Sequence, residues 1–121
     1  MEDHSRMQLD QFISEFDDRE KALSILKKFA ERSVGDVKTL YSELESGNHA
    51  GFHRLAHALK GGAMNIGAVS MMEKARTLES IYKENNFFAD GMPETTRKDI
   101  LEKLAELETE IVYLSDFIDT L

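Results

Sequence analysis

The stretch from Asn48 to Ala68, NHAGFHRLAHALKGGAMNIGA, decides the fold of this chain. Two adjacent glycines, Gly61 and Gly62, lie inside it, although each costs about 1 kcal/mol in a helix relative to alanine. We infer that something approaches the helix closely there; the alternative is that the glycines permit tight contact with another helix. The apolar residues of the stretch recur at helical spacing and predict one core-facing stripe, formed by Phe52, Leu55, Ala56, Leu59, Ala63 and Ile66.

A second flank of this helix carries ionisable side chains. His57, Lys60 and Gly61 are separated by three and four residues, so they are neighbours on one helical surface. Neutral imidazole is a competent nucleophile at physiological pH. An ammonium group one turn away can offset the oxygen charges of a transferring phosphoryl group. The pattern therefore indicates phosphoryl transfer through His57, with Gly61 leaving room for the loop of a partner.

The twelve residues from His57 to Ala68, HALKGGAMNIGA, resemble the H-x-L-K-G-x-x-x-x-[hydrophobic]-G-A signature of histidine-containing phosphotransfer (HPt) domains. Members of this family shuttle phosphate between receiver-domain aspartates in multistep two-component relays. The resemblance implies that His57 is the phosphoacceptor, usually through Nε2. It also implies that Lys60 and Gly61 flank the acceptor.

The resemblance further implies the partners, which are response-regulator receiver domains and a hybrid sensor histidine kinase. We expect a phosphocarrier without a kinase domain of its own, and no cofactor, because the Mg²⁺ needed for the exchange would belong to the receiver. His53 and Met64, which lie near the acceptor, are candidate partner-binding residues. Relatives often use a glutamine on the following helix to orient the acceptor ring. Antiparallel alignment from Gly67 places Glu79 there, and the alternative is a solvated glutamate.

The rest of the chain indicates an all-α fold, an antiparallel up-down four-helix bundle preceded by a short N-terminal helix. We expect one domain over residues 1–121, with a flexible tail at 1–7 and a loop at 85–92 in which Phe87 and Phe88 tuck under the bundle. The predicted helices are a short one around Leu9–Phe16, then Arg19–Glu45, the stretch ending at Ile66, Ala68–Lys83, and one from Pro93 to the end. The core-facing residues predicted for the second of these are Ala22, Ile25, Leu26, Phe29, Ser33, Val37, Leu40, Tyr41 and Leu44.

Composition excludes several classes of function. The 121 residues include 23 acidic and 15 basic side chains, and the net charge of −8 argues against nonspecific binding to nucleic acid. There is no cysteine, signal peptide or apolar run long enough to span a membrane, so we expect a cytoplasmic monomer. The initial Met1 and the lack of a linker favour a free-standing protein.

Three other interpretations compete with a phosphocarrier. His49, His53 and His57 recur every four residues, as in helical zinc sites, but the third drifts about 80° around the helix from the first, so we predict no metal site. A helical adaptor that binds a receiver or kinase without carrying phosphate is the main alternative. A histidine kinase would also present a phosphorylated histidine, but nothing resembling an ATP-binding domain follows.

Overall fold

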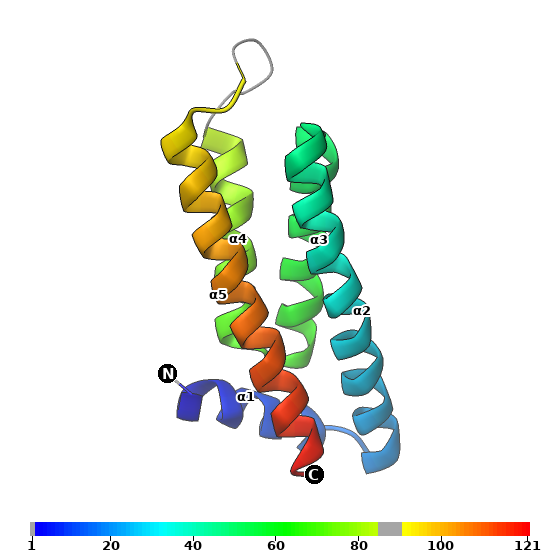
Figure 1. Cartoon of the computed structure of the whole chain (residues 1–121). Coiled ribbons are helices and arrows are strands. Elements are labelled where there is room, and N and C mark those ends of the chain that lie inside the picture. Colours follow the sequence, from blue (N-terminus) through cyan, green and yellow to red (C-terminus); the bar gives the residue numbers. More distant parts are fainter. Residues whose placement is uncertain (1, 85–90) are drawn as a thin grey trace.

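The computed structural model describes residues 2–84 and 91–121, and the side chains of residues 8–82 and 91–121. Within these ranges the chain forms five helices and no strand (Figure 1). They are α1 (Glu2–Ser14), α2 (Arg19–Ser46), α3 (His49–Ile66), α4 (Val69–Glu84) and α5 (Glu94–Asp119). The helices α2 to α5 run alternately up and down, and α1 crosses the lower end of the bundle. The predicted all-α bundle with an extra N-terminal helix is confirmed.

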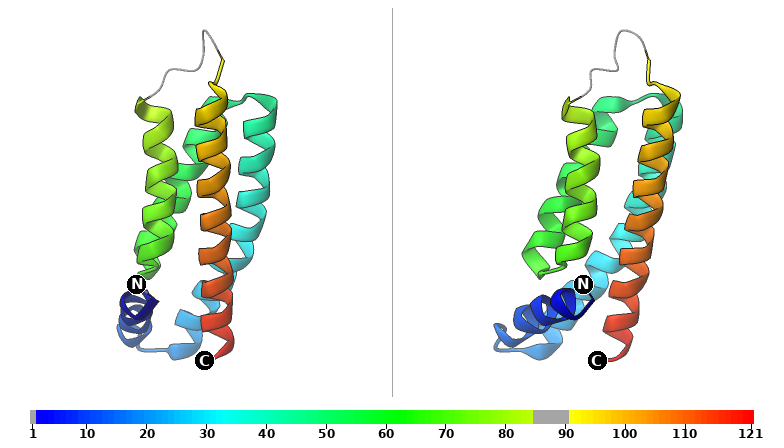
Figure 2. Two further views of the ribbon diagram at one scale, coloured as in Figure 1. Left: turned by 60° about the vertical axis from the view of Figure 1, so that its left-hand side comes forward. Right: turned by 90° about the vertical axis from the view of Figure 1, so that its left-hand side faces the viewer.

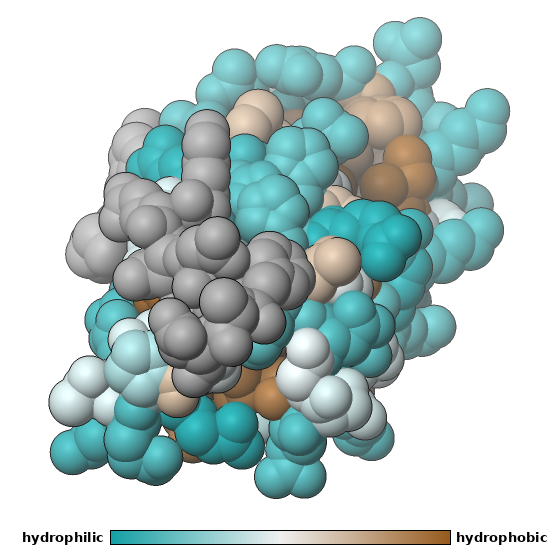
Figure 3. All heavy atoms as spheres, turned by 90° about the horizontal axis from the view of Figure 1, so that it is seen from above, coloured by the Kyte–Doolittle hydropathy of each residue, from teal (hydrophilic) through white to brown (hydrophobic). Residues whose placement is uncertain are grey.

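The four long helices enclose one hydrophobic core. α2 packs against α3 and α5, and α4 packs against the same two helices, so the contacts close into a ring (Figure 2). Every long helix contributes fully buried apolar side chains at helical spacing, and the largest of them include Leu26, Leu40, Phe52, Leu59, Met71, Leu78, Ile100, Leu104, Leu107 and Leu114. Seen from above, the described surface at the upper end of the bundle is mostly hydrophilic (Figure 3).

Local sequence signals set the ends of the helices that carry the site. The side chain of Asp18 accepts a hydrogen bond from the backbone of Glu20 and caps α2. Gly47 ends α2 in the left-handed conformation, and Asn48 then caps α3 by accepting from the amide of Gly51. This short connection keeps α2 and α3 antiparallel and adjacent.

Gly67 ends α3 for two reasons. Its φ of 79° lies in the left-handed region that favours glycine. In addition, a Cβ atom at this position would lie only 2.6 Å from the backbone oxygen of Gln8 in α1. The turn between α3 and α4 is thus the place where α1 crosses the end of the bundle, held there by the buried side chains of Leu9 and Ile13.

The structure differs from the predicted elements in two respects. α1 begins at Glu2, within the predicted tail at 1–7, because this segment has no proline or glycine to stop a helix and the prediction followed only the apolar residues. Ile25 was expected in the core but is 40 % exposed, since the adjacent Leu26 occupies the core position. The predicted contacts of Phe87 and Phe88 lie outside the described residues.

Ser33 lies in the core as predicted from its place on the apolar stripe of α2. Its hydroxyl donates a 2.7 Å hydrogen bond to the backbone oxygen of Phe29, which satisfies the buried polar group. α2 is one continuous helix through Gly35 and extends over the length of the bundle.

Candidate functional site

The side chain of His57 projects from the middle of α3 toward α4. Its Nδ1 atom is hydrogen-bonded to Oε2 of Glu79, and the imidazole is 65 % exposed. An ionised carboxylate accepts hydrogen bonds, so this contact selects the tautomer in which Nδ1 carries the proton. The lone pair of Nε2 is then available on an exposed ring, which is the state required of a nucleophile.

Lys60 lies one turn after His57 on α3 and binds the same carboxylate. Its Nζ atom is 2.6 Å from Oε1 of Glu79, and its side chain is only 21 % exposed. Side chains on a helix lean toward its N-terminus, so Lys60 reaches back to the level of His57. Sequence reasoning placed Lys60 beside the phosphoryl group, whereas the structure shows its ammonium engaged with Glu79.

The carboxylate of Glu79 links these two residues and is 12 % exposed. Burial raises the pKa of this carboxyl, but the hydrogen bonds from Lys60 and His57 together outweigh burial, and the pKa lies below its usual value. Glu79 is therefore ionised at neutral pH. Antiparallel alignment from Gly67 predicted a residue of α4 at this position, and Glu79 occupies it.

A cavity of about 680 Å³ opens between α3 and α4 next to the imidazole. Its lining has three cationic side chains and one anionic side chain, and consists of His53, Arg54, His57, Lys60, Arg76, Glu79 and Ser80. Nε2 of His53 lies 3.9 Å from Oε2 of Glu79, so His53 faces the site. His49 does not line this cavity, because its ring packs beside Tyr82.

Three residues of this cavity were not predicted from the sequence, namely Arg54, Arg76 and Ser80. Each of the two arginines precedes a residue of the site by three positions on its own helix, Arg54 before His57 and Arg76 before Glu79. The i, i+3 spacing that places side chains on one helical surface could have identified both.

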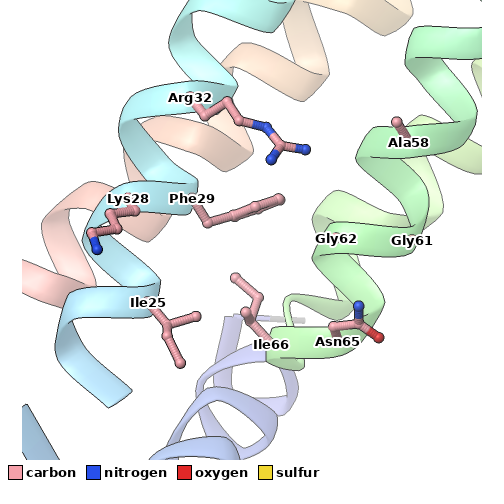
Figure 4. A pocket seen from close by; sticks show the side chains of 9 residues that line it. All are labelled: Ile25, Lys28, Phe29, Arg32, Ala58, Gly61, Gly62, Asn65 and Ile66. Carbon is pink, nitrogen blue, oxygen red and sulfur yellow. The ribbon is translucent and has the colours of Figure 1, made fainter. Parts of the chain in front are cut away.

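The two adjacent glycines of α3 face different surroundings. No atom lies within 4 Å of the position that a Cβ at Gly61 would occupy, whereas a Cβ at Gly62 would lie 2.4 Å from Cε1 of Phe29. Gly62 thus allows α2 and α3 to pack closely, and Gly61 leaves an open surface on the turn after His57. Both glycines line a second cavity of about 570 Å³ between α2 and α3, into which Phe29 and Arg32 project (Figure 4).

Met64 continues the surface beyond Gly61 and is 58 % exposed. An exposed methionine is an adaptable apolar contact. It lies at i+7 from His57, so both belong to one face of α3. This position is compatible with the predicted role in partner binding.

Neither a metal site nor a membrane-spanning helix is found among the described residues. Within residues 2–84 and 91–121, no group of three or more histidine, aspartate or glutamate side chains is placed to hold a metal ion. In the same part of the chain, no helix combines the length and the apolar character needed to cross a membrane.

Comparison with known proteins agrees with this geometry. The sequence matches the Hpt domain family over residues 24–116, which include the whole of α3 and α4 and most of α2 and α5. No curated protein matches the chain. The family match covers far more than half of the 121 residues and includes the histidine, lysine and glycine of the motif. The chain therefore belongs to the Hpt domain family, whose members take part in histidine phosphotransfer with receiver domains and kinases.

Proposed function

We propose that His57 accepts a phosphoryl group from the aspartyl phosphate of one receiver domain and passes it to an aspartate of another. The observation that carries this proposal is the exposed imidazole of His57 with Nδ1 bound to Glu79. That contact prepares Nε2 for attack without a general base. The chain contributes the nucleophile and its surroundings, and the receiver contributes Mg²⁺ and the aspartate.

The transfer step balances without any further reactant. The lone pair of Nε2 attacks the phosphorus of the aspartyl phosphate, and the bond from phosphorus to the carboxylate oxygen breaks. The aspartate leaves as a carboxylate with that electron pair. The phosphorylated ring keeps its proton on Nδ1 and gains a positive charge, which the adjacent carboxylate of Glu79 offsets. Transfer to the second receiver is the reverse reaction with a new aspartate.

Lys60 contributes mainly through Glu79 in this proposal. Its 2.6 Å hydrogen bond fixes the carboxylate and keeps it ionised beside the ring. From the sequence, the positive charge of Lys60 is predicted to act on the phosphoryl group. In this proposal it acts on Glu79, which in turn contacts the ring of His57. Lys60 is in this sense a positioning residue for His57.

The receiver would dock over the surface that continues from Gly61 to the α2 side of α3. This surface includes exposed apolar side chains, Ile25 and Met64, and the cavity at Gly61 and Gly62. An exposed apolar surface next to a polar acceptor is typical of a protein interface. The open space at Gly61 would let the receiver bring its aspartyl phosphate in line with Nε2.

The test is phosphotransfer from a phosphorylated receiver domain, with Mg²⁺ present, to the wild type and to His57→Gln. We expect label on the wild type that is labile in acid and stable in base, and background label on the variant. Circular dichroism should show the same helix content for both, because the exposed ring is not part of the core. Retained label in the variant would overturn the assignment. Tight receiver binding with no transfer to the wild type would favour the adaptor.

A further inference from the structure

The engagement of Lys60 leaves an electrostatic question at the acceptor. A phosphoryl group on Nε2 carries close to two negative charges at neutral pH. Lys60 already forms a 2.6 Å ion pair with Glu79, and this pair is largely shielded from solvent. Any movement of the ammonium toward the phosphoryl group would leave the carboxylate without its strongest partner. The charge of Lys60 is therefore largely offset by Glu79, and further positive charge at the phosphoryl group would have to come from other side chains of the cavity.

Two arginines are placed to supply that charge. Arg54 on α3 and Arg76 on α4 approach the cavity from opposite sides and line it together with His57. Both side chains are exposed. In the part of the chain whose side chains are described, neither arginine forms an ion pair.

The net charge of the cavity also favours binding of a phosphoryl group between the two arginines. Lys60 and Glu79 neutralise each other, so Arg54 and Arg76 leave a local excess of two positive charges. This excess lies on a chain with a net charge of −8, so it is not a general property of the surface. Guanidinium groups are always charged and bind phosphate oxygens through two parallel hydrogen bonds.

We propose that Arg54 and Arg76 bind the phosphoryl group carried by His57 and provide positive charge in addition to Lys60, whose charge is largely offset by Glu79. This inference rests on the proposed function, because it requires a phosphoryl group on His57. It assigns to the α3–α4 cavity the binding of a phosphoryl dianion, from two helices at once. The alternative is that the arginines contact only acidic residues of the docked receiver.

The test measures the ionisation of the phosphoryl group without any receiver present. Phosphoramidate, a small phosphodonor, would phosphorylate His57 by attack of Nε2 on phosphorus and release of ammonia. The ³¹P resonance of the phosphohistidine would then be followed from pH 6 to 9. A nearby cation favours the dianion, so loss of an arginine should raise the midpoint pH of this titration.

We expect an upward shift of about 0.2 to 0.7 pH units for Arg54→Ala or Arg76→Ala, the range given by exposed charge pairs. The double variant should shift further, and Arg→Lys at both positions should restore part of the wild-type value. Lys98→Ala, which removes one exposed cation from α5, is the matched control and should leave the midpoint unchanged.

An unchanged midpoint in the double variant, with His57 still labelled, would overturn the inference. The same holds if transfer from a receiver slows while the midpoint stays constant, because the arginines would then contact only the receiver. Label that is transferred from a receiver and persists in His57→Gln would instead overturn the proposed function. The two failures are thus distinguishable.

Discussion

The two flanks of α3 differ in chemistry although the cavities beside them are similar in size. Toward α4 the cavity of about 680 Å³ is lined by charged side chains around His57 and Glu79. Toward α2 the cavity of about 570 Å³ is lined by four apolar side chains and by Gly61 and Gly62, together with Lys28, Arg32 and Asn65, and none of these described residues is a histidine or carries a carboxylate. In the proposed function, the two flanks of this helix have different roles, with the chemistry on the α4 flank and the approach of the partner on the α2 flank.

The difference between the two flanks of α3 extends to the adjacent residues Gly61 and Gly62. Gly61 faces open space and Gly62 faces the ring of Phe29, although they are adjacent in the sequence. A rotation of about 100° per residue is enough to separate a docking position from a packing position on a helix. Experiments that alter one flank should therefore leave the function of the other intact, and the following variants test this separation.

The largest effect is expected for Gly61→Gln. A glutamine side chain here would fill the space beside the acceptor, so transfer from a receiver should slow on the order of 10- to 100-fold through misplacement of the donor. Folding should be preserved, because no atom lies near the new Cβ. The measurement is the rate of transfer from a phosphorylated receiver.

Phosphoramidate provides the control for this variant. It is small enough to reach His57 past the new side chain, so labelling by phosphoramidate should remain close to the wild-type level. Equal loss of both reactions would mean that Gly61 belongs to the chemistry of the site. The comparison between the two flanks would then fail.

Gly62→Ala should instead change stability. The added Cβ would lie 2.4 Å from Cε1 of Phe29, so α2 and α3 must shift apart or the ring must move. Such overpacking costs about 1–3 kcal/mol, against a gain of about 1 kcal/mol in helix propensity. We expect a net loss of about 1 kcal/mol in the free energy of unfolding, measured with urea.

Gly61→Ala is the matched variant for this measurement. Alanine at this open position gains the same helix propensity without a clash, so it should raise the free energy of unfolding by up to about 1 kcal/mol. The expected result is therefore that the free energy of unfolding rises in Gly61→Ala and falls in Gly62→Ala. A gain at both positions would show that Phe29 yields without cost and that Gly62 is not needed for packing.

The sequence was most informative where a structural feature depends on a few neighbouring residues. Gly47 and Asn48 specify the turn between α2 and α3, and Gly67 specifies the end of α3. The backbone conformation of each turn favours these residue types locally, without reference to the rest of the fold. Helical spacing likewise predicted the four long helices and most of the buried side chains of α2 and α3.

Features that depend on how helices meet were harder to predict. The engagement of Lys60 with Glu79 follows from the rotation of α3 against α4, which periodicity does not specify. The exposure of Ile25 likewise depends on how α2 is rotated in the bundle, which places the adjacent Leu26 in the core instead. The second constraint on Gly67, its contact with the backbone of Gln8, requires the crossing of α1.

The smallest effect is expected for Glu79→Gln, on the stability of the α4 flank. The pKa of Glu79 is lowered in the folded protein, so the ionised carboxylate stabilises the fold above the unfolded-state pKa, and this stabilisation is lost as the pH falls through the folded-state value. Glutamine has nearly the same shape and no charge. The variant should therefore be less stable than the wild type at pH 7, by less than about 1 kcal/mol, because the glutamine oxygen can still accept the hydrogen bond from Lys60. The difference should shrink as the pH falls through the lowered folded-state pKa of Glu79, because the wild-type carboxyl then becomes protonated too. Urea unfolding at pH 7 and at a series of lower pH values measures this, and a difference that is independent of pH would mean that Glu79 stabilises the fold by shape rather than by charge.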